Sequence, residues 1–70
     1  MNYSLKVIKH GQTEYGQYAL GSLANDIVLY NGIFNMVKPY DLQDGKIYKV
    51  KAVYIKQKEN NKIRVTLELI

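Results

Sequence analysis

Apolar and polar side chains alternate along residues 63–70. Every second position is apolar, and these positions are Ile63, Val65, Leu67 and Leu69. The positions between them are mostly polar. A period of two is typical of a β-strand that buries one face and exposes the other. We therefore predict a strand over this segment.

Residues 46–56 show the same period in a segment rich in β-branched and aromatic side chains. One face carries Tyr48, Val50, Ala52 and Tyr54. The other face carries Lys49 and Lys51. Between the two segments, residues 58–62 include an asparagine pair, and asparagine tolerates the left-handed backbone of a tight turn. The two segments are predicted to form a β-hairpin.

The first half of the chain is also β-like, but its pattern is more broken. Residues 3–9 read as a first strand that ends at a turn over residues 10–13. A second strand over residues 15–23 contains Gly16 and Gly21, and glycine within a strand often marks a bend or a close backbone approach. Residues 27–30 are predicted to form a third strand that ends at Asn31-Gly32.

Residues 32–45 are the only candidate for a different structure. Ile33, Phe34, Met36 and Val37 would lie on one side of a short helical turn. Pro39 would end that turn, because proline disfavours helix at the preceding residue. Asp44-Gly45 then forms a turn into the next strand. We expect one or two helical turns, or an irregular crossover.

These elements predict an all-β fold with five strands and a crossover between the third and the fourth. A small sheet has exposed edges, and closure into a barrel removes them. Bends at the two glycines of the second strand suit that closure. With 70 residues and no linker or repeat, the chain is expected to form a single domain over residues 1–70.

Composition excludes several kinds of chemistry. The chain has no cysteine and a single histidine, so it cannot build a disulfide framework, a cysteine zinc site or a histidine metal cluster. His10, Thr13 and Glu14 are close in sequence but are better explained as a polar loop than as a catalytic group. We expect no enzyme, no cofactor and no metal. No signal peptide or membrane span is visible, so we expect a cytoplasmic protein without a membrane partner.

The net charge of +4 is concentrated in the second half of the chain. Residues 1–45 carry three basic and four acidic groups, a net charge of −1, whereas residues 46–70 carry seven basic and two acidic groups, a net charge of +5. Such asymmetry suggests an anionic partner. The alternative is a solvated outer face that uses lysine for solubility and to discourage edge pairing.

The order of elements resembles oligonucleotide/oligosaccharide-binding (OB) domains. Residues 15–23 lead through a small polar turn into residues 27–30, like the hairpin that these domains use as a binding face. Residues 44–51 are similar to the opening of their fourth strand, although SH3-like barrels can show comparable alternation. The small, basic, tyrosine-rich layout looks most like the single-stranded DNA-binding proteins of phages and plasmids. The resemblance implies a groove flanked by the first loop and the C-terminal hairpin.

Non-specific binding of single-stranded nucleic acid needs aromatic faces for the bases and cations for the backbone. Among seven tyrosines, some of which must pack in the core, we expect Tyr15, Tyr18 and Tyr30 to stack on bases. The expected phosphate ligands are Lys49, Lys51, Lys56, Lys58, Lys62 and Arg64. The predicted partner is single-stranded DNA, with RNA not distinguished, and so small a core favours a homodimer in the cytoplasm of a bacterial cell or phage-infected host.

A second hypothesis belongs to a different class of function. The chain can also be interpreted as a small protein-interaction module, such as a phage-encoded inhibitor or an assembly subunit. Such a module would expose an apolar patch, here predicted at Ile33, Phe34 and Met36 on the crossover.

Overall fold

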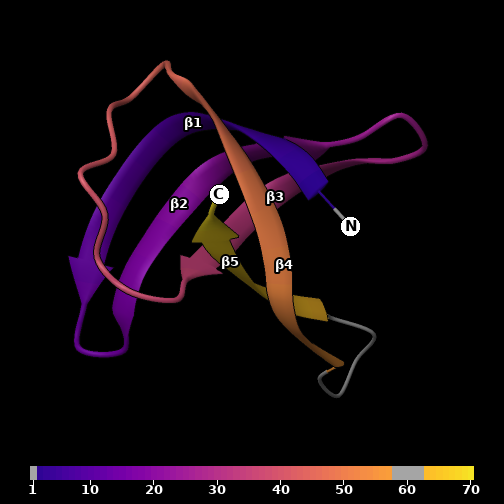
Figure 1. Ribbon diagram of the computed structural model, residues 1–70. Helices are drawn as coiled ribbons and strands as arrows, with labels where there is room; N and C mark the ends of the chain where they lie inside the picture. Colours follow the sequence, from indigo (N-terminus) through magenta and orange to yellow (C-terminus); the bar gives the residue numbers. More distant parts are fainter. Residues whose placement is uncertain (1, 58–62) are drawn as a thin grey trace.

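The computed structural model describes residues 2–57 and 63–70 and shows a five-stranded closed β-barrel (Figure 1). The strands are β1 (Asn2–Thr13), β2 (Gly16–Ala24), β3 (Leu29–Met36), β4 (Ile47–Gln57) and β5 (Ile63–Leu69). The described part of the chain contains no helix, and therefore none that is long and apolar enough to cross a membrane. The all-β, five-stranded prediction is confirmed.

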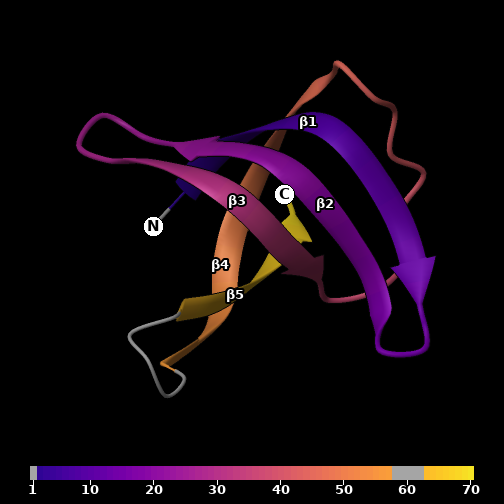
Figure 2. The same ribbon diagram turned by 180° about the vertical axis from the view of Figure 1, so that it is seen from behind.

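The strands follow one another around the barrel in the order β1, β2, β3, β5, β4, and β4 closes it against β1 (Figures 1 and 2). All neighbours are antiparallel except β3 and β5, which run parallel. The antiparallel pairing of β4 with β5 confirms the predicted hairpin, whose turn lies outside the described residues. This small barrel is compatible with an OB-like fold.

Alternation along each strand builds the core. Every strand contributes at least one buried apolar side chain, and the irregular crossover adds one more. The buried apolar residues are Leu5, Val7, Ala19, Leu23, Phe34, Met36, Leu42, Val50 and Leu67. Tyr3, Tyr40 and Tyr48 pack against this cluster from its margin. Burial of these side chains from all five strands is the main source of stability, because the hydrophobic gain scales with the apolar area removed from water.

The first strand is longer than predicted. Residues 10–13, predicted as a turn, are the end of β1, and the chain reverses at Glu14 and Tyr15 instead. The Thr13 hydroxyl supports this turn by accepting a hydrogen bond from the Tyr15 amide (3.1 Å) and donating one to the Gly16 carbonyl (3.2 Å). A bulge between Val7 and Lys9 shifts the register and lets β1 continue along β2.

The third strand also differs from the prediction, which ended it at Asn31-Gly32. It runs on to Met36. Phe34 and Met36 are buried, and Asn35 between them faces outward, which is a period of two rather than a helical turn. Gly32 is paired with Gly21 of β2. At Gly21 a Cβ atom would overlap the carbonyl oxygen of Lys6, so only glycine allows β1 and β2 to approach this closely.

The crossover over residues 37–46 is irregular and closes one end of the barrel. Its buried Leu42 reaches the core, and Gln17, only 7% exposed, holds it in place. The Gln17 amide donates to the Tyr40 carbonyl (2.8 Å) and accepts from the Tyr40 amide (2.9 Å). The predicted turn at Asp44-Gly45 is present. The irregular form of the crossover is therefore the correct one of the two predicted.

A second bulge lies in β4, between Ala52 and Tyr54. Before it, Val50 is buried and Tyr48 packs against the core, as the alternation predicted. The Tyr48 hydroxyl also accepts a hydrogen bond from the Gln43 amide (2.8 Å). After the bulge the faces exchange, so Tyr54 is 57% exposed and does not share the inward face of Tyr48.

Candidate functional site

One row of register partners crosses all five strands on the outer face of the barrel. Gly11 of β1 pairs with Tyr18 of β2, which pairs with Asn35 of β3. Asn35 pairs with Thr66 of β5, and Thr66 pairs with Tyr54 of β4. Because side chains alternate along a strand and the neighbours of Tyr18 and Asn35 are buried, these two side chains point outward.

A groove of about 560 Å³ lies over this face and is called the outer groove here. Its lining comes from the end of β1, the turn after it, β2, β3 and the start of β5. The lining residues are Lys9, Thr13, Tyr15, Tyr18, Leu20, Ile33, Asn35 and Arg64. Residues of four strands meet here because β1, β2, β3 and β5 are successive neighbours in the barrel.

The two tyrosines of the outer groove are held differently. Tyr15 stands at the β1–β2 turn and is 91% exposed, so its ring is available on both sides. Tyr18 is half-buried, and its ring lies over Gly11, where a Cβ atom would come within 2.5 Å of the Tyr18 hydroxyl oxygen. Because Gly11 has no side chain, the Tyr18 ring can pack directly against the β1 backbone. The Tyr18 ring is therefore packed against β1, whereas the Tyr15 ring is exposed at the turn.

The charged side chains in the described lining of the outer groove are both cations. Lys9 enters from β1 and Arg64 from β5, and the part of the lining that the structure describes contains no acidic side chain. Neither cation belongs to an ion pair within residues 2–57 and 63–70; the pairs found there are His10 with Asp44 and Lys51 with Glu68. Unpaired cations on the two sides of an aromatic groove can attract an anion that is carrying planar groups.

The predicted site residues are only partly brought together. Tyr15, Tyr18 and Arg64 meet in the outer groove, whereas Tyr30 lines a different cavity. Lys49 and Lys51 lie where β4 pairs with the start of β1, at exposed positions that line neither hollow.

The remaining predicted lysines are near the hairpin turn. Lys56 is the register partner of Arg64, which places its backbone beside the outer groove. Lys58 and Lys62 lie outside the described residues.

Several groove residues escaped the sequence-based prediction. Ile33 and Asn35 fell in the segment predicted as a helical turn or an irregular crossover, although their alternation with Phe34 and Met36 carried the signal that they face outward. Lys9 was not singled out because the bulge that places it beside β2 leaves no mark in the sequence. Phe34 and Met36 are buried, so the apolar patch predicted for a protein-interaction module is reduced on the surface to Ile33.

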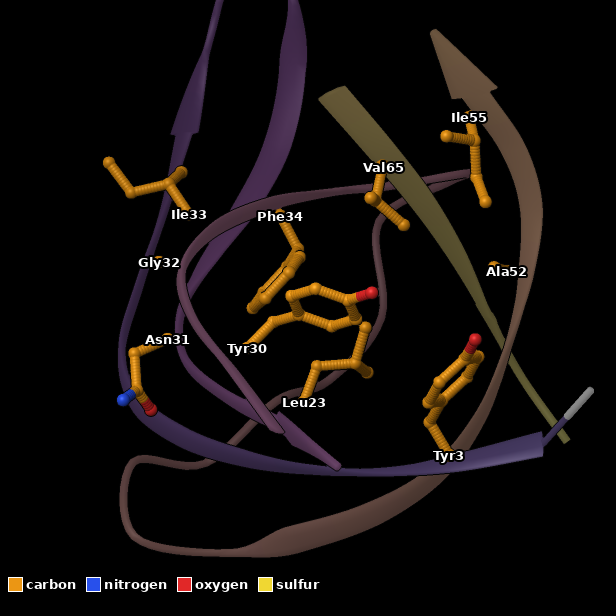
Figure 3. A pocket seen from close by; sticks show the side chains of 10 residues that line it. All are labelled: Tyr3, Leu23, Tyr30, Asn31, Gly32, Ile33, Phe34, Ala52, Ile55 and Val65. Carbon is orange, nitrogen blue, oxygen red and sulfur yellow. The ribbon is translucent and has the colours of Figure 1, made fainter. Parts of the chain in front are cut away.

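A second, smaller cavity of about 250 Å³ opens through the barrel wall and is called the side pocket here (Figure 3). It exists because β3 and β5 pair only at Asn35–Thr66 and Met36–Leu67. Its walls include Tyr3, Leu23, Tyr30, Ala52 and Val65.

The single histidine has its partner in the crossover. His10 Nδ1 lies 2.7 Å from Asp44 Oδ1, so its partner is the crossover turn rather than Glu14. The Thr13 hydroxyl is occupied by the β1–β2 turn. Residues 2–57 and 63–70 also hold no group of three or more histidine, cysteine, aspartate or glutamate side chains placed to bind a metal ion.

Comparison of this chain with protein-family models, with curated proteins and with solved structures gave no match. A functional assignment therefore depends on the geometry of the outer groove and the side pocket.

Proposed function

We propose that the protein binds single-stranded nucleic acid, in the first place DNA, in the outer groove and without sequence preference. The observation that supports this most strongly is the composition of the groove. Among the described residues, it combines two tyrosine rings with two cations that have no ion-pair partner, and it has no acidic side chain. Stacking surfaces and a positive path along the backbone are the two requirements for this kind of binding.

Each group has a distinct role in the proposal. The rings of Tyr15 and Tyr18 stack on successive bases, which is worth about 1–3 kcal/mol per base. Lys9 and Arg64 neutralise phosphates on the two sides of the groove. Single strands are preferred because the bases of a duplex are already stacked and paired. Sequence tolerance follows because every base offers a planar face.

The class of protein, its cellular compartment and its oligomeric state are part of the same proposal. A closed five-stranded barrel with this groove suits a small OB-type protein like the single-stranded DNA-binding proteins of phages and plasmids, acting in the cytoplasm. A homodimer would place two grooves on one strand and raise the effective affinity without new contacts.

Fluorescence anisotropy with labelled oligonucleotides tests the proposal. Single-stranded DNA, duplex DNA and single-stranded RNA of about twelve nucleotides, within the range that one such barrel covers, are titrated at two salt concentrations. We expect single strands to bind best, with log affinity falling by about 0.7 per phosphate contacted for each unit of log salt. Equal affinity for duplex and single strand, or no binding at low salt, would overturn the proposal.

A further inference from the structure

The side pocket borders the outer groove. Ile33 lines both of them and is 66% exposed, so it stands on the ridge that separates the two. Tyr30 lies three positions earlier on the same strand and lines the side pocket (Figure 3). A polymer that follows the outer groove towards β3 therefore reaches the mouth of the side pocket.

The size and walls of the side pocket limit what it can hold. A volume of about 250 Å³ is below the range of about 300–1,000 Å³ that is common for drug-sized ligands. Leu23, Phe34 and Val65 supply an apolar wall, and no charged residue lines the pocket among those that the structure describes. These properties suit one small, neutral and largely flat group.

Two tyrosine hydroxyls give the side pocket its polar character. Tyr3 enters from β1 and Tyr30 from β3 (Figure 3). The hydroxyls of Tyr40 and Tyr48 accept backbone amide hydrogen bonds, but those of Tyr3 and Tyr30 have no hydrogen-bond partner within residues 2–57 and 63–70. A ligand with donors and acceptors at its edge would satisfy them, since a tyrosine hydroxyl can both donate and accept.

From these observations we infer that the side pocket takes up one nucleobase of the strand bound in the outer groove. This inference rests on the proposed function. The base leaves the stack at the Ile33 ridge, packs against the apolar wall, and turns its polar edge to the two hydroxyls. Proteins hold extruded bases by the same combination of aromatic or apolar packing and edge hydrogen bonds. The two stacked bases and the inserted base together would fix the strand in one register.

An abasic scan tests the inference. A single abasic nucleotide is moved along a labelled oligonucleotide whose length matches one binding site, so that only one binding register is possible, and the affinity is measured at each position. We expect one position beyond the stacked bases to lose about tenfold in affinity. In the variant Ala52→Leu, whose larger side chain fills the pocket, that loss should shrink to less than about twofold, because the base can no longer enter.

Two further variants keep the result interpretable. Ala24→Leu is the matched control, since Ala24 lies at the end of β2 and lines neither hollow, and it should retain the tenfold loss. Tyr30→Phe removes one hydroxyl from a side chain that is 49% exposed, so folding should be preserved even if Ala52→Leu fails to fold. It should weaken binding of the intact oligonucleotide about threefold and leave binding of the abasic one unchanged.

The outcomes separate the two proposals. If oligonucleotides bind and binding depends on Tyr15, but the abasic scan shows only the stacked positions and neither pocket variant changes it, the pocket assignment is wrong and the proposed function stands. If no oligonucleotide binds at low salt, the proposed function is wrong and the pocket assignment falls with it. A position-specific loss that disappears in Ala52→Leu supports both.

Discussion

The outer groove and the wall formed by β1 and β4 both carry cations, but only the outer groove combines them with tyrosine rings among the described residues. On the β1–β4 wall, Lys49 and Lys51 lie at exposed positions, and Lys51 is 3.9 Å from Glu68. In the outer groove, Lys9 and Arg64 are unpaired within the described residues and share a hollow with two tyrosines. If the proposed function holds, the position of the cations relative to the aromatic rings should matter more than their number.

The largest effect is expected from a substitution that disrupts the barrel, because the barrel forms both the outer groove and the β1–β4 wall. Gly21→Ala should prevent β1 and β2 from pairing, because the new Cβ overlaps the Lys6 carbonyl oxygen. We expect a loss of more than about 3 kcal/mol in the free energy of unfolding, measured by urea denaturation. Gly32→Ala is the matched control: its Cβ would meet nothing within 4 Å, so unfolding should change by less than about 1 kcal/mol. Equal effects of the two substitutions would contradict the close approach.

The next effect concerns aromatic stacking in the outer groove. Tyr15→Ala should weaken single-strand binding by about 1–3 kcal/mol, while Tyr15→Phe should keep most of it, because stacking needs the ring and not the hydroxyl. Anisotropy gives the affinities. The thermal melting temperature should be unchanged, because the side chain is almost fully exposed. Equal losses for the alanine and phenylalanine variants would argue against stacking.

A smaller effect should come from the groove cation on β5. Arg64→Gln removes one phosphate contact, so we expect the slope of log affinity against log salt to become less steep by about 0.7. The loss should be similar for all sequences. A slope that does not change would remove Arg64 from the binding surface.

The smallest effect is expected on the β1–β4 wall. Lys51→Gln and Lys49→Gln should each change affinity by less than about twofold and leave the salt slope unaltered. Breaking the exposed pair of Lys51 with Glu68 should change the free energy of unfolding by no more than about 1 kcal/mol. If either lysine variant matched Arg64→Gln, the binding surface would have to extend around the barrel.

Features with a local cause could be predicted from the sequence. The β4–β5 pairing followed from alternation in two adjacent segments, and the turn at Asp44-Gly45 followed from its residue types. Tyr15, Tyr18 and Arg64 were predicted to bind, and they do meet in one groove. Whether they bind a nucleic acid stays a prediction.

Features with a long-range cause could not be predicted from the sequence. The bulges between Val7 and Lys9 and between Ala52 and Tyr54 decide which side chains face the groove, and they depend on the register that closes the barrel. The same register places Lys49 opposite Ser4 on the β1–β4 wall, and no local pattern reveals this pairing. For β3, by contrast, the alternation of Phe34 and Met36 was present in the sequence but was interpreted as a helical turn or an irregular crossover.

Mapping of backbone amide shifts by NMR during titration with a short single-stranded oligonucleotide tests the central claim most directly. The claim is that the outer groove, and not the β1–β4 wall, holds the strand. We predict that the largest changes occur over residues 13–20, over Ile33–Asn35 and at Arg64, with little change over residues 47–51. Changes concentrated at Lys49 and Lys51, or no change at low salt, would contradict the account.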